Sequence, residues 1–235
     1  RYLRLHGNAQ FGQGGLSHDL LYSIPKYGMV RDADYSGMKE GQAYHDHSEM
    51  FNSINSNLKA LVEGRSGPSG SWMDSIKGIM NAYIGAIPGK IEYEGKEITP
   101  QEFAADVLEF NPDDYVEITS YSHMPFYERV ELLVPDNWMR YEEYVNVPLD
   151  DFIAVMDHAL ENGYSVVLDL DVSEQTRDRE VGVSWTEHDL SGTTVSQEDR
   201  EVMFNNWSTT DDHLEHTVGI AKDQDGRKYY YTKDS

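Results

Sequence analysis

The sequence predicts an α+β protein in which most helices precede the strands. Amphipathic helical patterns dominate roughly the first two thirds of the 235 residues, and strand-like runs gather in the last third. No internal repeat is visible, and strands do not alternate regularly with helices as βαβ units require. The chain closes on a predicted antiparallel hairpin whose turn is Asp223–Gly226.

Three helices are predicted between residues 16 and 83. The first has apolar residues at helical spacing from Leu16 to Ile24, and we expect Pro25 and Gly28 to end it. The next two are amphipathic, and a capping box is expected at Ser71, where the third begins. Their apolar faces comprise Met50, Phe51, Ile54, Leu58, Leu61 and Val62, and Trp72, Met73, Ile76, Ile79, Met80 and Tyr83.

A polar loop is expected at residues 31–47, and a hairpin and a capped helix are expected after residue 90. Ile91 to Ile98 has the pattern of a small hairpin about Glu94-Gly95. The run Thr99-Pro100-Gln101-Glu102 supplies an N-cap, a proline at the first helical position and a glutamate at the third. This arrangement predicts a helix start.

The second half of the chain is predicted to mix strands with two helices. Pro148 is expected to open one helix, which Gly163 ends, and residues 196–207 form the other. Residues 173–195 are polar and are expected to be irregular. Strands are expected at Tyr115–Thr119, Val130–Val134 and Tyr164–Leu170, and the closing hairpin pairs His216–Ala221 with Lys228–Thr232.

Composition excludes several classes of function. Lys and Arg total 19 against 42 Asp and Glu, which gives a formal charge of −23, so a nucleic-acid partner is not expected. No apolar run reaches the length of about 18 residues that a membrane span needs. The absence of cysteine excludes disulfides, cysteine–zinc sites and a thiol nucleophile within these residues. The first residue is not Met, and both ends are expected to be cut.

The closing hairpin carries the clearest chemical pattern. His213 stands where the first strand begins and Asp234 where the second ends. An antiparallel pair joined by a tight turn brings such positions together. A histidine oriented by a carboxylate is the base half of a nucleophilic triad. The alternative is an ordinary surface or core histidine. His216 has the opposite strand parity, so one of the two histidines faces a cleft, and the preceding Asp212 favours His213.

The motifs around this hairpin resemble those of papain-like cysteine peptidases. Asp212-His213 followed by Gly219 is similar to the D-H-A-x-x-x-x-G pattern of the catalytic histidine. Lys233-Asp234-Ser235 is similar to the start of K-N-S-W-G, whose asparagine orients that histidine. Upstream, Gly12-Gln13-Gly14-Gly15 resembles the family's Gly-Gly wall, whose backbone binds a substrate segment as an added strand.

A finer resemblance is to the bleomycin hydrolase and aminopeptidase C branch. FGQGGLSHDLLYSIPKYGMV is similar to its G-G-x-x-x-D…K-Y-G stretch, and ITPQEFAADVL to its T-P-x-x-F helix. The run Tyr144 to Pro148 is similar to its N-x-P helix start, and the strand from Gly163 to Val172 to its strand ending in D-V. These matches occur in the same order along nearly the whole chain.

The resemblance implies a single papain-like domain over residues 1–235, with a largely helical insertion at 40–145 and a C-terminal antiparallel β-sheet. It implies His213 and Asp234 as catalytic residues and Gly14, Gly15 and Asp212 as substrate-binding residues. It further implies peptide substrates, no cofactor or metal, and a homo-oligomer, often a hexamer with an enclosed chamber. The implied compartment is the cytoplasm, or the periplasm or exterior if a signal peptide was removed upstream.

Two departures from the family stand out. The Cys-Trp nucleophile segment and its oxyanion glutamine are expected before Arg1. The orienting position carries Asp234 where the family has asparagine; an aspartate still accepts from the histidine and favours its imidazolium form. A catalytically inactive papain-like binding protein is therefore the second interpretation.

Metal binding is a third interpretation. His45-Asp46-His47, and Asp211-Asp212-His213 with His216, contain metal-ligand types, but neither has the spacing of a zinc site. Asp169 and Asp171 lie on one face of a strand and could form a carboxylate pair, although a strand end beside a polar loop is an ordinary place for them.

Overall fold

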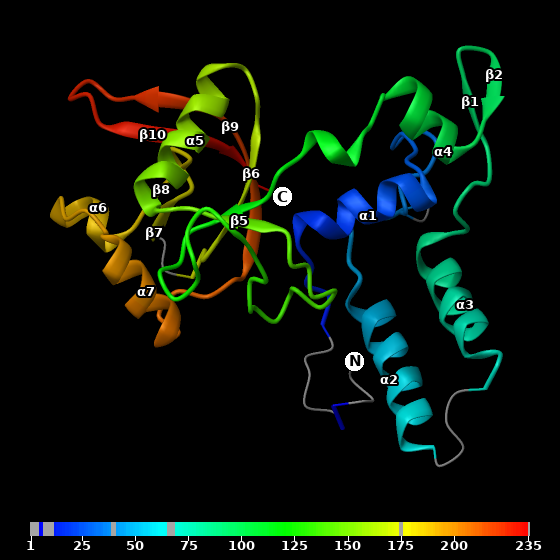
Figure 1. Cartoon of the computed structure of the whole chain (residues 1–235). Helices are drawn as coiled ribbons and strands as arrows, with labels where there is room; N and C mark the ends of the chain where they lie inside the picture. Colours follow the sequence, from blue (N-terminus) through cyan, green and yellow to red (C-terminus); the bar gives the residue numbers. More distant parts are fainter. Residues whose placement is uncertain (1–4, 7–11, 39–40, 65–68, 174–175, 235) are drawn as a thin grey trace. The chain divides into compact units, whose positions relative to one another are not determined.

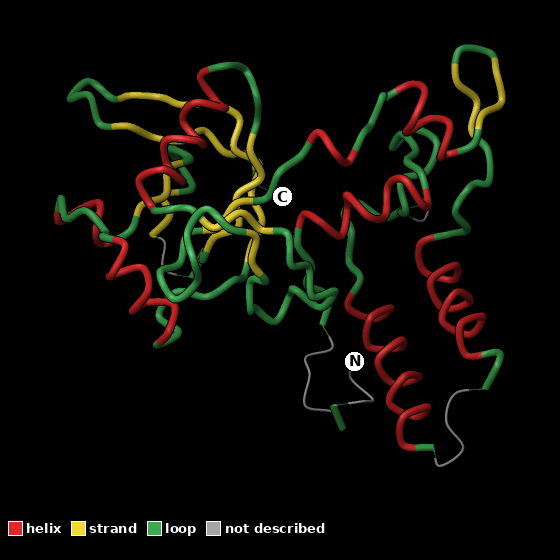
Figure 2. Tube along the Cα trace, viewed as in Figure 1, coloured by secondary structure: helices red, strands yellow, loops and turns green. Residues whose placement is uncertain are grey.

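The computed structural model describes residues 5–6, 12–38, 41–64, 69–173 and 176–234. The chain divides into two compact units, one comprising Arg1–Ala9 and Tyr22–Pro112 and the other Gln10–Leu21 and Asp113–Ser235. Strands concentrate in the second unit, as Figure 2 shows, while the first has helices and one small hairpin. The mixed content confirms the predicted α+β class.

Helix α1 (Ser17–Tyr27) differs from the prediction because Pro25 lies inside it. A proline there removes one helical hydrogen bond close to the helix end, where the loss matters least. Gly28 ends the helix with a φ of 81°, and its N–H donates to the Ile24 carbonyl. A side chain at this position would overlap the backbone of Pro100, so only glycine fits.

Helices α2 (Ser48–Glu63) and α3 (Trp72–Ile84) form a helical hairpin at nearly the predicted bounds. The hydroxyl of Tyr83 donates to Glu49 at 2.9 Å and joins them. None of their residues is buried. The capping box predicted at Ser71 is wrong, because its side chain accepts no capping hydrogen bond. The hydroxyl of Ser75 donates to the Ser71 carbonyl instead.

The hairpin and capped helix predicted after residue 90 are confirmed. Strands β1 (Ile91–Tyr93) and β2 (Lys96–Ile98) are antiparallel, and Glu94 and Gly95 take positive φ angles in the turn. Helix α4 (Pro100–Glu102) begins with a complete capping box, in which Thr99 and Glu102 each accept from the other's backbone N–H. A π-helical turn, Phe103–Val107, continues the helix, and the turn Pro112–Asp114 follows.

The main sheet of the second unit contains the closing hairpin. Its strands are β6 (Val166–Leu170), β9 (His213–Lys222) and β10 (Lys228–Lys233), in the order β10-β9-β6 with antiparallel pairing. Helix α5 (Leu149–Glu161) contacts β9 and β6, and Figure 1 shows it in front of the closing hairpin. Asp157 on α5 accepts from Lys228 and Tyr230, which fixes β10 to the helix.

The pairing of β9 with β10 contains a one-residue irregularity. Tyr231 lies opposite Gly219, whereas the next residue, Thr232, lies opposite Thr217. Val218 is therefore an extra residue on β9, as in a β-bulge. Beyond it, Lys233 lies opposite His216.

A second sheet is smaller than the sequence predicts. Its order is β3 (Ile118–Thr119), β5 (Tyr144–Asn146) and β4 (Arg129–Val130). Most of the predicted runs 115–119 and 130–134 is irregular, and β5 lies where only a helix start was expected. The fully buried amide of Asn146 on β5 holds the loop that follows β3. It accepts from the Tyr121 N–H and donates to the carbonyls of Tyr121, Met124 and Pro125.

Residues 173–195 were predicted to be irregular, and this is wrong where the structure describes them. They form the hairpin β7 (Thr176–Asp178) and β8 (Val183–Trp185) and the short helix α6 (Glu187–Ser191). Three-residue strands are too short to show an alternating pattern. Helix α7 (Gln197–Asn205) follows as predicted, and Ser196 and Asp199 form its capping box.

The core of the second unit anchors both ends of the predicted site. It consists of Leu16, Tyr121, Val130, Leu132 and Tyr144, and Leu214 packs against it. Leu16 directly follows Gly14-Gly15, and Leu214 directly follows His213. Burial of these two side chains therefore positions the backbone beside both predicted motifs.

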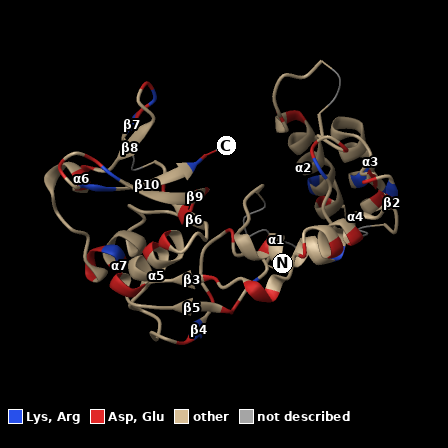
Figure 3. Ribbon diagram, turned by 90° about the horizontal axis from the view of Figure 1, so that it is seen from above, with Lys and Arg blue, Asp and Glu red and all other residues tan. Residues whose placement is uncertain are grey.

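The predicted domain boundaries stay a prediction. Residues 113–145, which the resemblance assigns to a helical insertion, group with the second unit and carry β3 and β4. Acidic residues are spread over both units, as the red segments of the ribbon in Figure 3 show. Among the described residues, no helix combines the length and apolar character that crossing a membrane would require.

Candidate active site

His213 and Asp234 meet at the end of the closing hairpin, as the sequence predicts. Nε2 of His213 lies 2.6 Å from Oδ1 of Asp234. Their side chains are 31% and 38% exposed, so both are accessible from solvent. An ionised carboxylate only accepts hydrogen bonds, so Nε2 carries the proton and Nδ1 remains on the other side of the ring. This is the geometry of an oriented base.

His216, the alternative histidine, is exposed and does not meet Asp234. It lies opposite Val167 on β6 and Lys233 on β10. His213 and Glu215 share the other face of β9, because side chains alternate along a strand. Of the two histidines, His213 is thus the one held by a carboxylate.

Arg177 on β7 is a member of this cluster that the sequence analysis missed. Its Nη1 lies 3.4 Å from Oδ2 of Asp234, and its Nη2 lies 3.7 Å from Oε1 of Glu215. Glu215 is buried, with its side chain 8% exposed. Residue 177 falls in the segment that has no recognisable pattern, so no sequence signal pointed to it.

Asp212, predicted to bind substrate, contacts the backbone at the strand end. Its Oδ1 accepts from the Val172 N–H at 2.9 Å, which joins the end of β6 to the start of β9. Asp171 adds a second tie, because it accepts from the backbone and hydroxyl of both Ser173 and Thr210. Burial alone would raise the pKa of Asp171, but these hydrogen bonds lower it to about 2.

Gly14 and Gly15 are held close to two carboxylates. A side chain at Gly14 would overlap the carboxylate of Asp136, and one at Gly15 would come within 2.6 Å of Oδ2 of Asp19. Asp19 accepts from the Leu16 N–H at 3.1 Å and from the indole of Trp138 at 3.0 Å. The glycines are therefore required by close approach rather than by positive φ. Their substrate-binding role stays a prediction.

A buried carboxylate pair lies beside the histidine strand. Asp169 on β6 faces Leu214 on β9, and it interacts with Asp211 rather than with Asp171. Burial raises the pKa of Asp169 to about 8, and the negative charge of Asp211 adds to this. Burial also raises the pKa of Asp211. At neutral pH the pair therefore holds one proton, and Asp169 carries it.

His18 is a buried histidine that no sequence signal marked. Its Nδ1 lies 3.4 Å from Oε2 of Glu117, and its Nε2 lies 3.9 Å from Oδ1 of Asp19. The ring stacks on Tyr141 with centroids 4.5 Å apart. The Glu117 carboxylate also accepts from the His18 backbone N–H. His18 thus fixes the start of α1 and, with it, the segment that carries Gly14 and Gly15.

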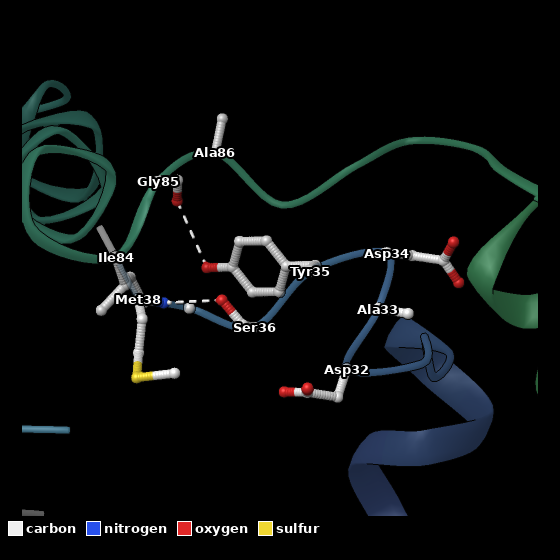
Figure 4. A pocket seen from close by; sticks show the side chains of 10 residues that line it. Asp32, Ala33, Asp34, Tyr35, Ser36, Met38, Ile84, Gly85 and Ala86 are labelled. Carbon is white, nitrogen blue, oxygen red and sulfur yellow. Dashed lines mark hydrogen bonds between the residues drawn. The ribbon is translucent and has the colours of Figure 1, made fainter. Parts of the chain in front are cut away.

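Each unit contains a hollow within the described part of the chain. The larger, about 340 Å³, lies between residues 32–38 and 84–86 of the first unit. Figure 4 shows the Tyr35 ring inside it, with the hydroxyl donating to the Gly85 carbonyl. The smaller, about 250 Å³, adjoins the candidate site and is lined by Val167, Leu214, Glu215, His216, Lys233 and Asp234. Asp234 of the candidate pair lines the smaller hollow, whereas His213 is not among its lining residues.

Neither predicted metal-like pattern forms a group of three ligands within the described residues. The rings of His45 and His47 are 5.3 Å apart, and His216 faces away from His213. Within the described residues, His213, Glu215 and Asp234 are the one group of three close enough to surround a cation. The guanidinium of Arg177 already supplies a positive charge there.

Comparison with known proteins places the fold. No family model matches the chain, and no curated protein matches it in sequence. Among solved structures, PepW from Lactobacillus rhamnosis HN001 (DR20) is similar, with a TM-score of 0.69 and 19% sequence identity. The match covers 95% of this chain and 56% of PepW, so the chain spans little more than half of that protein's length. The chain therefore shares the α+β fold of PepW.

Proposed function

We propose that this chain is the larger part of a cysteine-type peptidase related to bleomycin hydrolase and aminopeptidase C. The observation that carries the proposal is the 2.6 Å contact between His213 and Asp234 at the end of the β9–β10 hairpin. The fold shared with PepW, a peptidase-related protein, supports it. The thiol nucleophile would lie in polypeptide outside these residues, because they contain no cysteine.

In this proposal the chain supplies the base and its orienting group. Asp234 holds Nε2, so Nδ1 exchanges a proton with the thiol, and the thiolate attacks the peptide carbonyl. The imidazolium then returns the proton to the leaving amine. The carboxylate of Asp234 favours the imidazolium that forms in between.

Peptide recognition is assigned to the backbone at Gly14 and Gly15. An extended substrate would pair with this segment as an added strand, and Asp212 is proposed as a further substrate-binding residue. Exopeptidase specificity, a hexamer-type homo-oligomer and a cytoplasmic location rest on the family resemblance alone. A periplasmic or secreted location is the alternative.

The first test uses the parent protein that includes the polypeptide preceding Arg1. We expect a thiol-directed inhibitor to label it, and His213→Ala to lower kcat/KM on aminoacyl fluorogenic peptides by at least about 10³-fold. Asp234→Ala should lower kcat/KM by a smaller factor. The matched control is His188→Ala, which removes an exposed imidazole on α6.

Three results would count against the proposal. Absence of inhibitor labelling would contradict the thiol mechanism. Full turnover in Asp234→Ala would contradict the orienting role of Asp234. Loss of turnover in His216→Ala, with His213→Ala unaffected, would assign the base to the other histidine.

The second candidate is a catalytically inactive binding protein with the same fold. It is favoured by Asp234 at the asparagine position and by the lack of cysteine in these residues. In that case the parent protein would bind peptides without turning them over. Peptide binding measured by calorimetry, together with failure of inhibitor labelling, would select this candidate.

A further inference from the structure

Arg177 contacts both carboxylates that face His213. Oδ1 of Asp234 lies against His213, whereas Oδ2 lies 3.4 Å from the guanidinium of Arg177. The second nitrogen of Arg177 lies 3.7 Å from the carboxylate of Glu215. One arginine side chain therefore spans the orienting aspartate and the neighbouring residue on the histidine face of β9.

The charges in this cluster require a fixed cation. Glu215 is buried, and an unpaired buried carboxylate is costly. With Asp234 also ionised, the His213 ring would face two negative charges. A guanidinium presents two N–H groups in a rigid fork, which suits two separate carboxylates better than an ammonium does.

We propose that Arg177 is a positioning residue that offsets the negative charge of Asp234 at the His213 ring. An asparagine in the orienting position would bring no charge and need no partner. An aspartate with an arginine on its second oxygen keeps the hydrogen bond to His213 while the pair adds no net charge. The inference deepens the proposed function and rests on it for its catalytic meaning.

Other charged groups near His213 do not supply this cation. Leu170 of β6 lies opposite His213, with carboxylates on either side of it, and Lys233 lies opposite His216. Apart from Arg177, the charged and titratable groups around His213 on these strands and on the lead-in to β9 are Asp169, Asp171, Asp211, Asp212, Glu215, His216, Lys233 and Asp234. Most of them are acidic, so removal of Arg177 leaves an excess of negative charge.

The test is an NMR titration of the His213 imidazole in the 235-residue chain. Arg177→Gln should move the titration midpoint to higher pH by about 0.5–1 unit, because the imidazolium gains net negative surroundings. Asp234→Asn should move the midpoint to lower pH. The double variant should return close to the unsubstituted chain, since one charge of each sign is removed. Arg179→Gln, which removes a positive charge from the same hairpin, is the matched control.

Arg177→Lys keeps the positive charge but loses the fork geometry. Its His213 titration midpoint should therefore lie close to that of the unsubstituted chain. If Arg177 has a purely structural role, Arg177→Gln should lower the unfolding temperature. The His213 midpoint should then not shift in opposite directions in Arg177→Gln and Asp234→Asn, and the double variant should show no compensation. That outcome, or a shift equal to that of Arg179→Gln, overturns the proposal. The titration needs no turnover, so it stands even if the parent protein has no peptidase activity.

Discussion

Asp169 and Asp171 are two residues apart, yet the protein moves their pKa values in opposite directions. Asp169 is buried beside Asp211, and its pKa rises to about 8. Asp171 is also desolvated, but its hydrogen bonds from Ser173 and Thr210 outweigh this and lower its pKa to about 2. The number of donors aimed at each carboxylate therefore decides its charge at neutral pH.

The variant Asp169→Asn tests the raised pKa of Asp169. The folded pKa of Asp169 is raised, so the folded chain holds a proton that the unfolded chain loses above about pH 4. Stability is therefore lost as the pH rises from about 4 to 8. Asparagine cannot ionise and still donates to Asp211. We expect the variant to gain stability over the unsubstituted chain as the pH rises, with little difference near pH 4.

Urea unfolding at pH 4.5, 6 and 8 measures the effect. Asp225→Asn, in the exposed turn of the closing hairpin, serves as the control and should show no such trend. A constant difference between Asp169→Asn and the unsubstituted chain at all three values would mean that Asp169 is already ionised in the fold.

At the element scale, capping motifs predicted only part of the helices. The helix start at Thr99 was predicted from its capping box, and a helix was expected from Ser196 onward. The equally complete capping box of Thr186 and Asp189 lies in a segment that was predicted to be irregular. Ser71 has a similar pattern but forms no cap, and Pro25 does not end α1. The hairpin β7–β8 could not be predicted, since its strands are too short to show a periodic pattern.

Asn146 links β5 to the loop 121–125 through four hydrogen bonds of its buried amide. We expect Asn146→Ala to lower the free energy of unfolding by about 2–4 kcal/mol, because it leaves buried backbone groups unpaired. Asn205→Ala, on exposed α7, should cost less than about 1 kcal/mol. Urea denaturation followed by tyrosine and tryptophan fluorescence compares the two, and equal costs would contradict the assigned role of Asn146.

At the scale of the whole molecule, the acidic surplus is the dominant feature. A formal charge of −23 implies self-repulsion in the folded state. The Debye length falls to about 10 Å at 0.1 M salt, so salt screens this repulsion. We expect the midpoint of thermal unfolding to rise between 20 and 200 mM NaCl, on the order of a few degrees.

Calorimetry at equal ionic strength in KCl is the control, because a general screening effect does not depend on the cation. A midpoint that falls with salt would mean that ion pairs such as Lys228–Asp157 outweigh the repulsion.

The candidate site could be predicted only in part from the sequence. His213 and Asp234 could be placed from the hairpin, because a tight turn fixes which residues lie opposite each other. Arg177 could not, since it reaches the site from a segment that carries no motif. His18 and Asp211 lie within or beside quoted motifs, but no sequence pattern indicates their tertiary contacts with Glu117 and Asp169. The sequence thus predicted the two residues that one hairpin brings together and missed those that other segments supply.

The extra residue Val218 on β9 determines which histidine side chain Asp234 contacts. Because residues directly opposite each other share a face, uninterrupted pairing would set Asp234 against His216. The bulge advances β10 by one residue, so continuing the pairing sets Asp234 opposite Glu215, on the His213 side. Deleting Val218 would remove the irregularity and leave Asp234 opposite Glu215, whereas pairing Val218 with Thr232 would set Asp234 opposite His216. The bulge therefore acts as a selector between two unaltered imidazoles.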